Sequence, residues 1–279
     1  MQLLTDRLKA SPKLLLDGSM GALMMAKGFN GPSIYGANFA HTDVVSGLHR
    51  SYFEAGADMV LTNTFSLTGH ILSAIGKSAA DTVKMAVEAA QIAREGFSGK
   101  YIALDLAPCD LSGNEAEQYY MERISAAAGL VDCIFFETYS DSGELKLAIQ
   151  IARSICSLPV FASMTFNENM ASWKGEMLGE AIASVAAERP DAIGINCTLS
   201  PSEMLGLIDS LIQAAGGIQT LCEPNRGMPE YIDGEAKYLL SAQDFASGVE
   251  AIYSKGVHIV GGCCGSDPEC IRLISQRLF

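Results

Sequence analysis

The chain has 279 residues, a formal net charge of −13 and a hydrophobic content of 49%. This length suits one large domain of the α/β-barrel size, and the apolar content is that of a protein with a large core. The acidic balance, without a cluster of lysines or arginines, argues against nucleic acid or an anionic membrane surface as a partner. No apolar run reaches the roughly 18–20 residues that a membrane span needs. Residues 1–13 also lack the apolar core of a secretory signal, so we expect a cytoplasmic protein.

From Lys13 onward, short apolar runs alternate with longer amphipathic, alanine-rich stretches. The apolar runs, each expected to form a buried strand, are 14–18, 58–64, 101–106, 133–137, 159–164, 192–197, 218–222 and 257–263. The stretches between them, each expected to contain a helix, are 41–55, 78–97, 115–128, 143–156, 179–188, 202–214, 242–255 and 267–278. Eight strand–helix units without a break in composition predict a single (β/α)8 TIM barrel domain over residues 1–279.

A doubly wound open sheet is the alternative architecture. Such a sheet usually carries a phosphate-binding glycine loop after its first strand, and residues 17–22 (Asp-Gly-Ser-Met-Gly-Ala) do not fit GxGxxG. The longest loops are expected at 28–39, 167–178 and 224–237. They follow the first, fifth and seventh strands, so a barrel would place them around its catalytic mouth.

Polar and thiol side chains follow the apolar strands at their C-terminal ends, where a barrel has its active site. They are Asp17, Asn63, Thr64, Asp105, Glu137, Asn196, Cys197, Cys263 and Cys264. Helix capping and hydrogen bonds to loop backbone are the alternative role for such residues. Glu137 is the hardest to explain in that way, because a carboxylate directly after an apolar run needs a partner.

Three of the eight cysteines are placed where they could meet. Cys197 ends the sixth strand, and Cys263 and Cys264 end the eighth between glycines that allow both sulfurs to turn toward one point. Because alternate strands of a barrel contribute to the same interior layer, the three thiolates have a route to one zinc ion with an open fourth position. The alternatives are redox cysteines, or core cysteines that never meet. A disulfide framework is not expected in a large intracellular chain.

The charge of a three-thiolate site determines its chemistry. Three thiolates more than neutralise Zn²⁺, so the ion would be a poor Lewis acid for polarising a carbonyl. Such an ion suits a substrate thiol instead, because the thiol loses its proton when it binds the metal. A free thiol with a pKa of about 8.5 is only a few per cent thiolate at pH 7. The residues therefore indicate alkylation of a substrate thiol. Hydrolysis is disfavoured, since of four histidines only His258 lies in a predicted strand.

The strand-end residues belong to longer motifs. These motifs are 16–21, 54–58, 62–65, 137–138, 194–197 and 261–265. Over nearly its whole length the sequence resembles the zinc-dependent homocysteine S-methyltransferases. The resemblance implies a (β/α)8 barrel enzyme that forms methionine by methylating the thiol of L-homocysteine. It also implies one Zn²⁺ per chain, bound by Cys197, Cys263 and Cys264, and no catalytic residue beyond the zinc site.

The resemblance further implies a set of residues that bind homocysteine. They are Asp17, Gly18, Asn63, Thr64, Glu137 and Asn196. Asp17 and Glu137 are similar to the groups that hold the amino group, which fits the need of a buried ammonium for carboxylate partners. The others are expected to contribute strand-end hydrogen bonds and a close approach of the backbone.

The methyl donor divides this family. Residues 223–230 (Glu-Pro-Asn-Arg-Gly-Met-Pro-Glu) are most similar to the homocysteine-binding barrel of cobalamin-dependent methionine synthase, which carries a Pro-Asn-x-Gly-x-Pro run. The sequence ends at Phe279 without a folate or corrinoid module. We therefore expect the methyl group to come from a methyl-corrinoid on a separate protein, or from S-methylmethionine.

Two residues around the end of the third strand depart from the family pattern. Relatives usually have a smaller residue in place of Asp105 and a glycine in place of Ala107. A different small thiol is therefore the alternative acceptor. In that reading the chain is the thiol- and zinc-binding subunit of a corrinoid methyltransferase complex.

Overall fold

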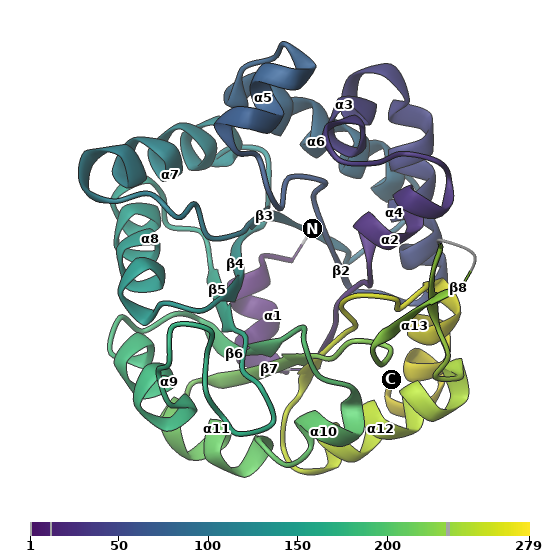
Figure 1. Ribbon diagram of the computed structural model, residues 1–279, viewed down its shortest axis with the longest axis vertical. Helices are drawn as coiled ribbons and strands as arrows, with labels where there is room; N and C mark the ends of the chain where they lie inside the picture. Colours follow the sequence, from purple (N-terminus) through teal and green to yellow (C-terminus); the bar gives the residue numbers. More distant parts are fainter. Residues whose placement is uncertain (1, 12, 233–234) are drawn as a thin grey trace.

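Eight apolar segments pair as parallel strands in one sheet of the computed structural model, which describes residues 2–11, 13–232 and 235–279 (Figure 1). The strands are β1 (Leu14–Leu15), β2 (Met59–Leu61), β3 (Tyr101–Leu106), β4 (Cys133–Tyr139), β5 (Val160–Met164), β6 (Ala192–Asn196), β7 (Gln219–Glu223) and β10 (Ile259–Val260). Their order is β1-β10-β7-β6-β5-β4-β3-β2, and a bridge between Leu16 and Met59 joins the two edges. The predicted TIM-barrel fold is confirmed.

Helices cover the outside of this barrel (Figure 1). They are α2 (Met20–Ala26), α3 (Pro32–Ala40), α4 (Thr42–Ala55), α5 (Gly69–Ile75), α6 (Ala79–Arg94), α7 (Gly113–Ala127), α8 (Ser142–Ile155), α9 (Leu178–Ala186), α10 (Pro201–Met204), α11 (Ile208–Ala215), α12 (Ala242–Ser254) and α13 (Pro268–Leu278). In α8 the side chains of Leu145, Ala148, Ile149 and Ala152 are buried at a spacing of three and four, so one face packs on the barrel. Asp141 caps its first turn by accepting from the backbone N–H of residues 143 and 144.

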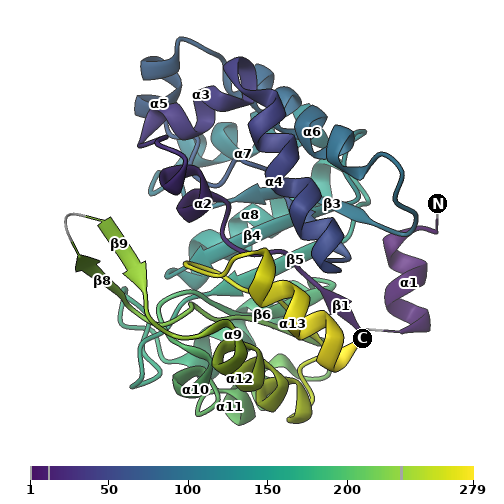
Figure 2. The same ribbon diagram turned by 90° about the vertical axis from the view of Figure 1, so that its right-hand side faces the viewer.

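The barrel interior has its own apolar core. Leu14, Leu16, Phe135 and Phe161 pack there, where alternating side chains point inward from the strands. Leu4 of the N-terminal helix α1 (Leu4–Ala10) belongs to the same cluster. Figure 2 shows α1 at one end of the barrel, far from the projecting strands β8 and β9. We infer that α1 closes the N-terminal end and leaves the opposite end for the site.

The structure differs from the sequence expectations in several places. Residues 28–39, expected as a loop, contain most of α3, because Pro32 occupies a first-turn position that favours helix. The single helix expected over 202–214 is two helices, interrupted around Gly206, a poor helix former. The connection 224–237 contains a hairpin, β8 (Pro229–Ile232) with β9 (Glu235–Tyr238). His258 lies before β10 rather than within it.

Within the described ranges, no helix combines the length and the apolar content that crossing a bilayer requires.

Candidate metal centre and substrate cavity

Three cysteine sulfurs meet at the C-terminal end of the barrel. The Sγ atoms of Cys197, Cys263 and Cys264 all lie within 4.8 Å of one another, and Cys197 and Cys264 are 3.8 Å apart. A tetrahedral zinc ion with Zn–S bonds of about 2.3 Å needs sulfurs about 3.8 Å apart. All eight cysteines are free thiols. The spacing and the donor type therefore fit zinc, and the predicted convergence of the three cysteines is confirmed.

The end of β7 holds both cysteine segments in place. Cys197 has a φ of 63°, a left-handed conformation, and its N–H donates to the carbonyl of Glu223 at 3.0 Å. From the other side, Cys263 N–H donates to the Pro224 carbonyl at 2.8 Å and Cys264 N–H donates to Asn225 Oδ1 at 3.0 Å. Three successive residues at the end of β7 thus align the ends of β6 and β10, the two strands that flank it.

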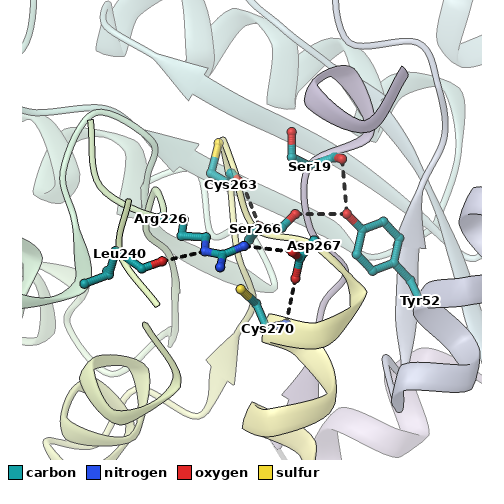
Figure 3. A network of polar contacts seen from close by, with 8 residues as sticks. All are labelled: Ser19, Tyr52, Arg226, Leu240, Cys263, Ser266, Asp267 and Cys270. Carbon is teal, nitrogen blue, oxygen red and sulfur yellow. Dashed lines mark hydrogen bonds and ion pairs between the residues drawn. The ribbon is translucent and has the colours of Figure 1, made fainter. Parts of the chain in front are cut away.

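A polar network anchors the loop that follows the cysteine pair (Figure 3). Ser266 donates through Oγ to the Cys263 carbonyl at 2.6 Å, and its own carbonyl accepts from Tyr52 Oη at 3.1 Å. Arg226 forms an ion pair of 2.7 Å with Asp267, the residue that caps α13. These contacts tie the loop to α4, to α13 and to the segment after β7, so the sulfurs are supported from three directions.

The three thiols lie close enough to change one another's pKa. Hydrogen bonds from Cys263 and Cys264 lower the pKa of Cys197 to about 3. The same contact with Cys197 raises the pKa of Cys264 to about 12 and also raises that of Cys263. Three thiols this close together therefore do not all ionise without a compensating positive charge. A divalent cation that replaces the two thiol protons supplies the charge that three thiolates need.

Asn196 lies behind the cavity and fixes Glu137. Its Nδ2 donates to Glu137 Oε2 at 2.8 Å and to Thr138 Oγ1 at 2.8 Å. Its Oδ1 accepts from the N–H of Thr138 and from Ser163 Oγ, and the residue is fully buried. Asn196 Nδ2 is also 3.9 Å from Cys263 Sγ. The amide thus sets the position of Glu137 relative to the sulfurs.

Glu137 and Asp17 face the same cavity. Asp17 is 3% exposed, and its Oδ2 accepts from the Leu61 N–H at 3.0 Å. Burial raises the pKa of Asp17. Burial, together with the nearby negative charge of Cys197, raises the pKa of Glu137 to about 7. Two carboxyl groups removed from water in this way favour a cationic ligand.

The predicted residues Asn63, Thr64 and Gly18 mainly make contacts that hold the surrounding backbone in place. Asn63 Nδ2 donates to the Ile34 carbonyl at 2.8 Å and to Asn38 Oδ1 at 3.0 Å, so it holds α3 against the strand end. Thr64 Oγ1 donates to the Asp105 carbonyl at 2.7 Å. Gly18 packs tightly, since an added Cβ would lie 2.8 Å from Ser266 Oγ.

A cavity of about 360 Å³ joins these groups. The residues predicted for metal or substrate binding that line it are Asp17, Gly18, Asn63, Thr64, Glu137, Cys197, Cys263 and Cys264. Asp105 also lines it, whereas Ala107 is not among its lining residues in the described chain. The volume lies in the range of small-molecule sites, roughly 300–1,000 Å³.

Glu223 and Tyr238 are among the lining residues that were not expected from the sequence. Glu223 is the last residue of β7, one position beyond the predicted strand, and is 2% exposed. Tyr238 of β9 covers Gly265, where an added Cβ would meet its ring at 2.3 Å. Extending the predicted seventh strand by one residue would have placed Glu223 among the strand-end carboxylates. Nothing comparable in the sequence indicates Tyr238, because it reaches the site through the hairpin of β8 and β9 and not from the end of a barrel strand.

Sequence comparison relates the chain to one family and to larger proteins. The family described as "Homocysteine S-methyltransferase" matches residues 14–278. The methionine synthase of Mycobacterium tuberculosis (strain ATCC 25618 / H37Rv) is 30% identical over 292 residues, covering 94% of this chain and 24% of that protein. The methionine synthase of Mycobacterium leprae (strain TN) is 30% identical over 264 residues, covering 86% and 22%. The chain thus spans about a quarter of the length of these curated relatives.

Solved structures with a similar fold include the homocysteine methyltransferase MmuM from Escherichia coli. Its apo form has a TM-score of 0.78 and 20% identity, covering 99% of this chain and 98% of that chain. Its metallated form has a TM-score of 0.79 and 19% identity, covering 97% and 98%. The likeness extends over the whole barrel.

Proposed function

The chain belongs to the homocysteine S-methyltransferase family, and on that premise we propose that it transfers a methyl group to the sulfur of L-homocysteine to form methionine. One observation carries the proposal. Three cysteine sulfurs with the spacing of a zinc site line the same cavity as the carboxyl groups of Asp17 and Glu137. A thiol-binding metal and an ammonium-binding pair in one cavity match the two ends of homocysteine.

Zinc held by Cys197, Cys263 and Cys264 would supply one function, which is to keep the substrate thiol deprotonated at neutral pH. The chain supplies orientation. Asp17 and Glu137 would hold the amino group, because an ammonium placed between two desolvated carboxylates gains charge-assisted hydrogen bonds. No side chain beyond the metal site is assigned a catalytic role.

The remaining assigned residues would support this arrangement. Asn196 keeps the Glu137 carboxylate in position, and Asn63 holds α3 over the strand end. Thr64 anchors the end of β3, and the bare backbone of Gly18 allows close packing beside the cysteine loop. Their proposed part in substrate binding is therefore mainly positional.

Two kinds of methyl donor remain candidates. One candidate is a methyl-corrinoid carried by a partner protein, which agrees with the likeness of this chain to methionine synthases. S-methylmethionine is the other candidate. In the alternative function, the chain is the zinc- and thiol-binding subunit of a corrinoid methyltransferase complex and acts on another small thiol. Because the carboxyl group of Asp105 also lines the cavity, the identity of the acceptor thiol is tested separately from that of the methyl donor.

The donor is tested with the zinc-loaded chain, homocysteine and four donors in parallel: S-methylmethionine, S-adenosylmethionine, betaine and methylcobalamin. We expect methionine from at least one of them, measured by mass spectrometry. Turnover with methylcobalamin alone would assign the chain to a corrinoid system. No methionine from any donor, with homocysteine bound, would contradict self-sufficient methyl transfer and favour the subunit role.

Glu137→Gln is expected to raise the KM for homocysteine about 10- to 100-fold, because a charged hydrogen bond is worth about 1.5–3 kcal/mol. Zinc content should remain unchanged, since the cysteines are not altered. The matched substrate is 4-mercaptobutyrate, which is homocysteine without its amino group. The variant should lose most of the preference for homocysteine over this analogue. An unchanged preference would mean that Glu137 does not hold the amino group.

A further inference from the structure

The cavity contains more negative charge than one amino group can balance. Four carboxyl groups line it, those of Asp17, Asp105, Glu137 and Glu223. No lysine, arginine or histidine is among the lining residues of the described chain. Asp17 and Glu137 are accounted for by the amino group of homocysteine under the proposed function. Asp105 and Glu223 have no cationic partner in that account.

Asp105 has a buried oxygen without a donor. The side chain is 5% exposed, and its Oδ1 receives no hydrogen bond from any donor in the parts of the chain that are described. Burial raises the pKa of Asp105, and so does the carboxyl group of Glu137, with which Asp105 shares a side-chain hydrogen bond. That carboxyl group is itself an acceptor when ionised, so it cannot stabilise a second carboxylate.

The hydroxyl groups around Asp105 are already used. Thr64 Oγ1 donates to the Asp105 carbonyl at 2.7 Å. Thr62 Oγ1 lies 2.7 Å from Thr64 Oγ1 and accepts from the Asp105 N–H at 3.1 Å. Because the Thr64 proton is committed, the proton between the two hydroxyls must come from Thr62. Neither threonine therefore retains a hydroxyl proton for the Asp105 carboxylate.

Glu223 repeats the pattern on β7. The side chain is 2% exposed, and its Oε2 has no hydrogen-bond partner among the described residues. Its charged neighbours are also acidic, namely Glu137 and Asp17. A buried carboxylate without a donor is costly. Two such groups in one cavity therefore indicate that a ligand supplies the missing positive charge.

We propose that Asp105 and Glu223 form a second cation subsite, which binds an ammonium or onium group in addition to the amino group of homocysteine. This inference rests on the proposed function only in assigning Asp17 and Glu137 to the first amino group. The positive charge has two sources. It belongs either to a sulfonium or quaternary ammonium methyl donor, or to a second ammonium on the thiol acceptor.

The donor source gives a balanced reaction. The bond between the methyl carbon and the donor sulfur breaks, and its electron pair stays on that sulfur, which becomes a neutral thioether. The new bond forms from an electron pair of the homocysteine thiolate. The positive charge that the subsite recognised disappears during transfer, so the demethylated product would lose its attraction to Asp105 and Glu223.

The subsite is tested by calorimetry on the zinc-loaded full chain, with and without saturating homocysteine. The probes are choline and its uncharged isostere 3,3-dimethylbutan-1-ol. We expect choline to bind at least about tenfold more tightly, because the two differ in charge and hardly in shape. The double variant Asp105→Asn/Glu223→Gln should lose this preference. Glu230→Gln, which removes an exposed carboxylate on β8, should keep it.

Two further arms identify the source of the charge. A donor source predicts that the double variant raises the KM for S-methylmethionine at least about tenfold while homocysteine affinity stays within about twofold. An acceptor source predicts that homocysteine N-(2-aminoethyl)amide binds at least about tenfold more tightly than the matched N-propylamide. Either result supports the subsite.

The inference is overturned if the wild-type chain binds neither charged probe better than its neutral partner. That comparison needs no variant, so it holds even where the double variant fails to fold. Homocysteine binding is measured in the same preparation. Its absence would contradict the proposed function, whereas its presence without any charge preference would overturn the second subsite alone.

Discussion

Cys263→Ala is expected to reduce bound zinc from about one ion per chain to near zero and to reduce methyl transfer by more than about 100-fold. The expected loss exceeds the 10- to 100-fold typical for outer partners of a metal site, because a direct ligand is removed. Only two sulfurs would remain, and two of the chain's own thiolates rarely suffice for a zinc site of this kind. Cys197→Ala and Cys264→Ala should behave in the same way.

Zinc is measured by mass spectrometry of the purified protein, and methionine formation is measured on the same sample. Cys156→Ala is the matched control, because Cys156 is also a partly exposed free thiol but lies at the end of α8. It should retain full zinc and activity. A Cys263→Ala protein with stoichiometric zinc and normal kinetics would contradict the assignment of the ligands.

Gly194→Ala is expected to destabilise the barrel by more than about 3 kcal/mol, or to prevent folding, because overpacking of a buried strand against backbone leaves no room for relaxation. Gly194 lies in the middle of β6 and pairs with Leu221 of β7. An added Cβ would lie 1.9 Å from the Leu221 carbonyl oxygen. The added methyl group would force β6 and β7 apart close to Cys197, which directly follows β6.

Thermal unfolding followed by circular dichroism tests this expectation. For a chain of this size, about 3 kcal/mol lowers Tm by roughly 6 °C or more. Gly179→Ala is the control, because Gly179 lies in α9 with no atom within 4 Å of an added Cβ. Alanine there should leave Tm unchanged or raise it slightly. A Gly194→Ala protein that melts within about 2 °C of wild type would show that the strands do adapt.

The barrel could be predicted because its strands are mostly apolar and buried and its helices are amphipathic. Residues 101–106 were predicted as a strand and coincide with β3, since all six side chains are buried. Residues 28–39 were predicted as a loop but contain most of α3, in which Pro32 occupies a first-turn position that proline favours. Local patterns therefore identify buried elements well, but they do not distinguish helical from irregular surface connections.

The metal site could be predicted for a topological reason. Cys197 and Cys263 follow strands of one barrel, and strand ends in a barrel meet at one mouth. The second pair of carboxylates could be predicted only in part. Asp105 was recognised as a departure from its family, whereas Glu223 lay one residue beyond its expected strand. Hydrogen bonds such as those of Asn196 depend on side-chain geometry that the sequence does not contain.

The central claim is that the three cysteines bind zinc in order to bind homocysteine through its thiol. Calorimetric titration of homocysteine into zinc-loaded and zinc-free chain, in two buffers of different ionisation enthalpy, tests it most directly. We predict that homocysteine binds at least about 100-fold more tightly to the zinc-loaded chain. We also predict the release of roughly one proton per homocysteine at pH 7, because a free thiol with a pKa of about 8.5 is protonated before it binds. Equal affinity with and without zinc, and no proton release, would contradict the claim.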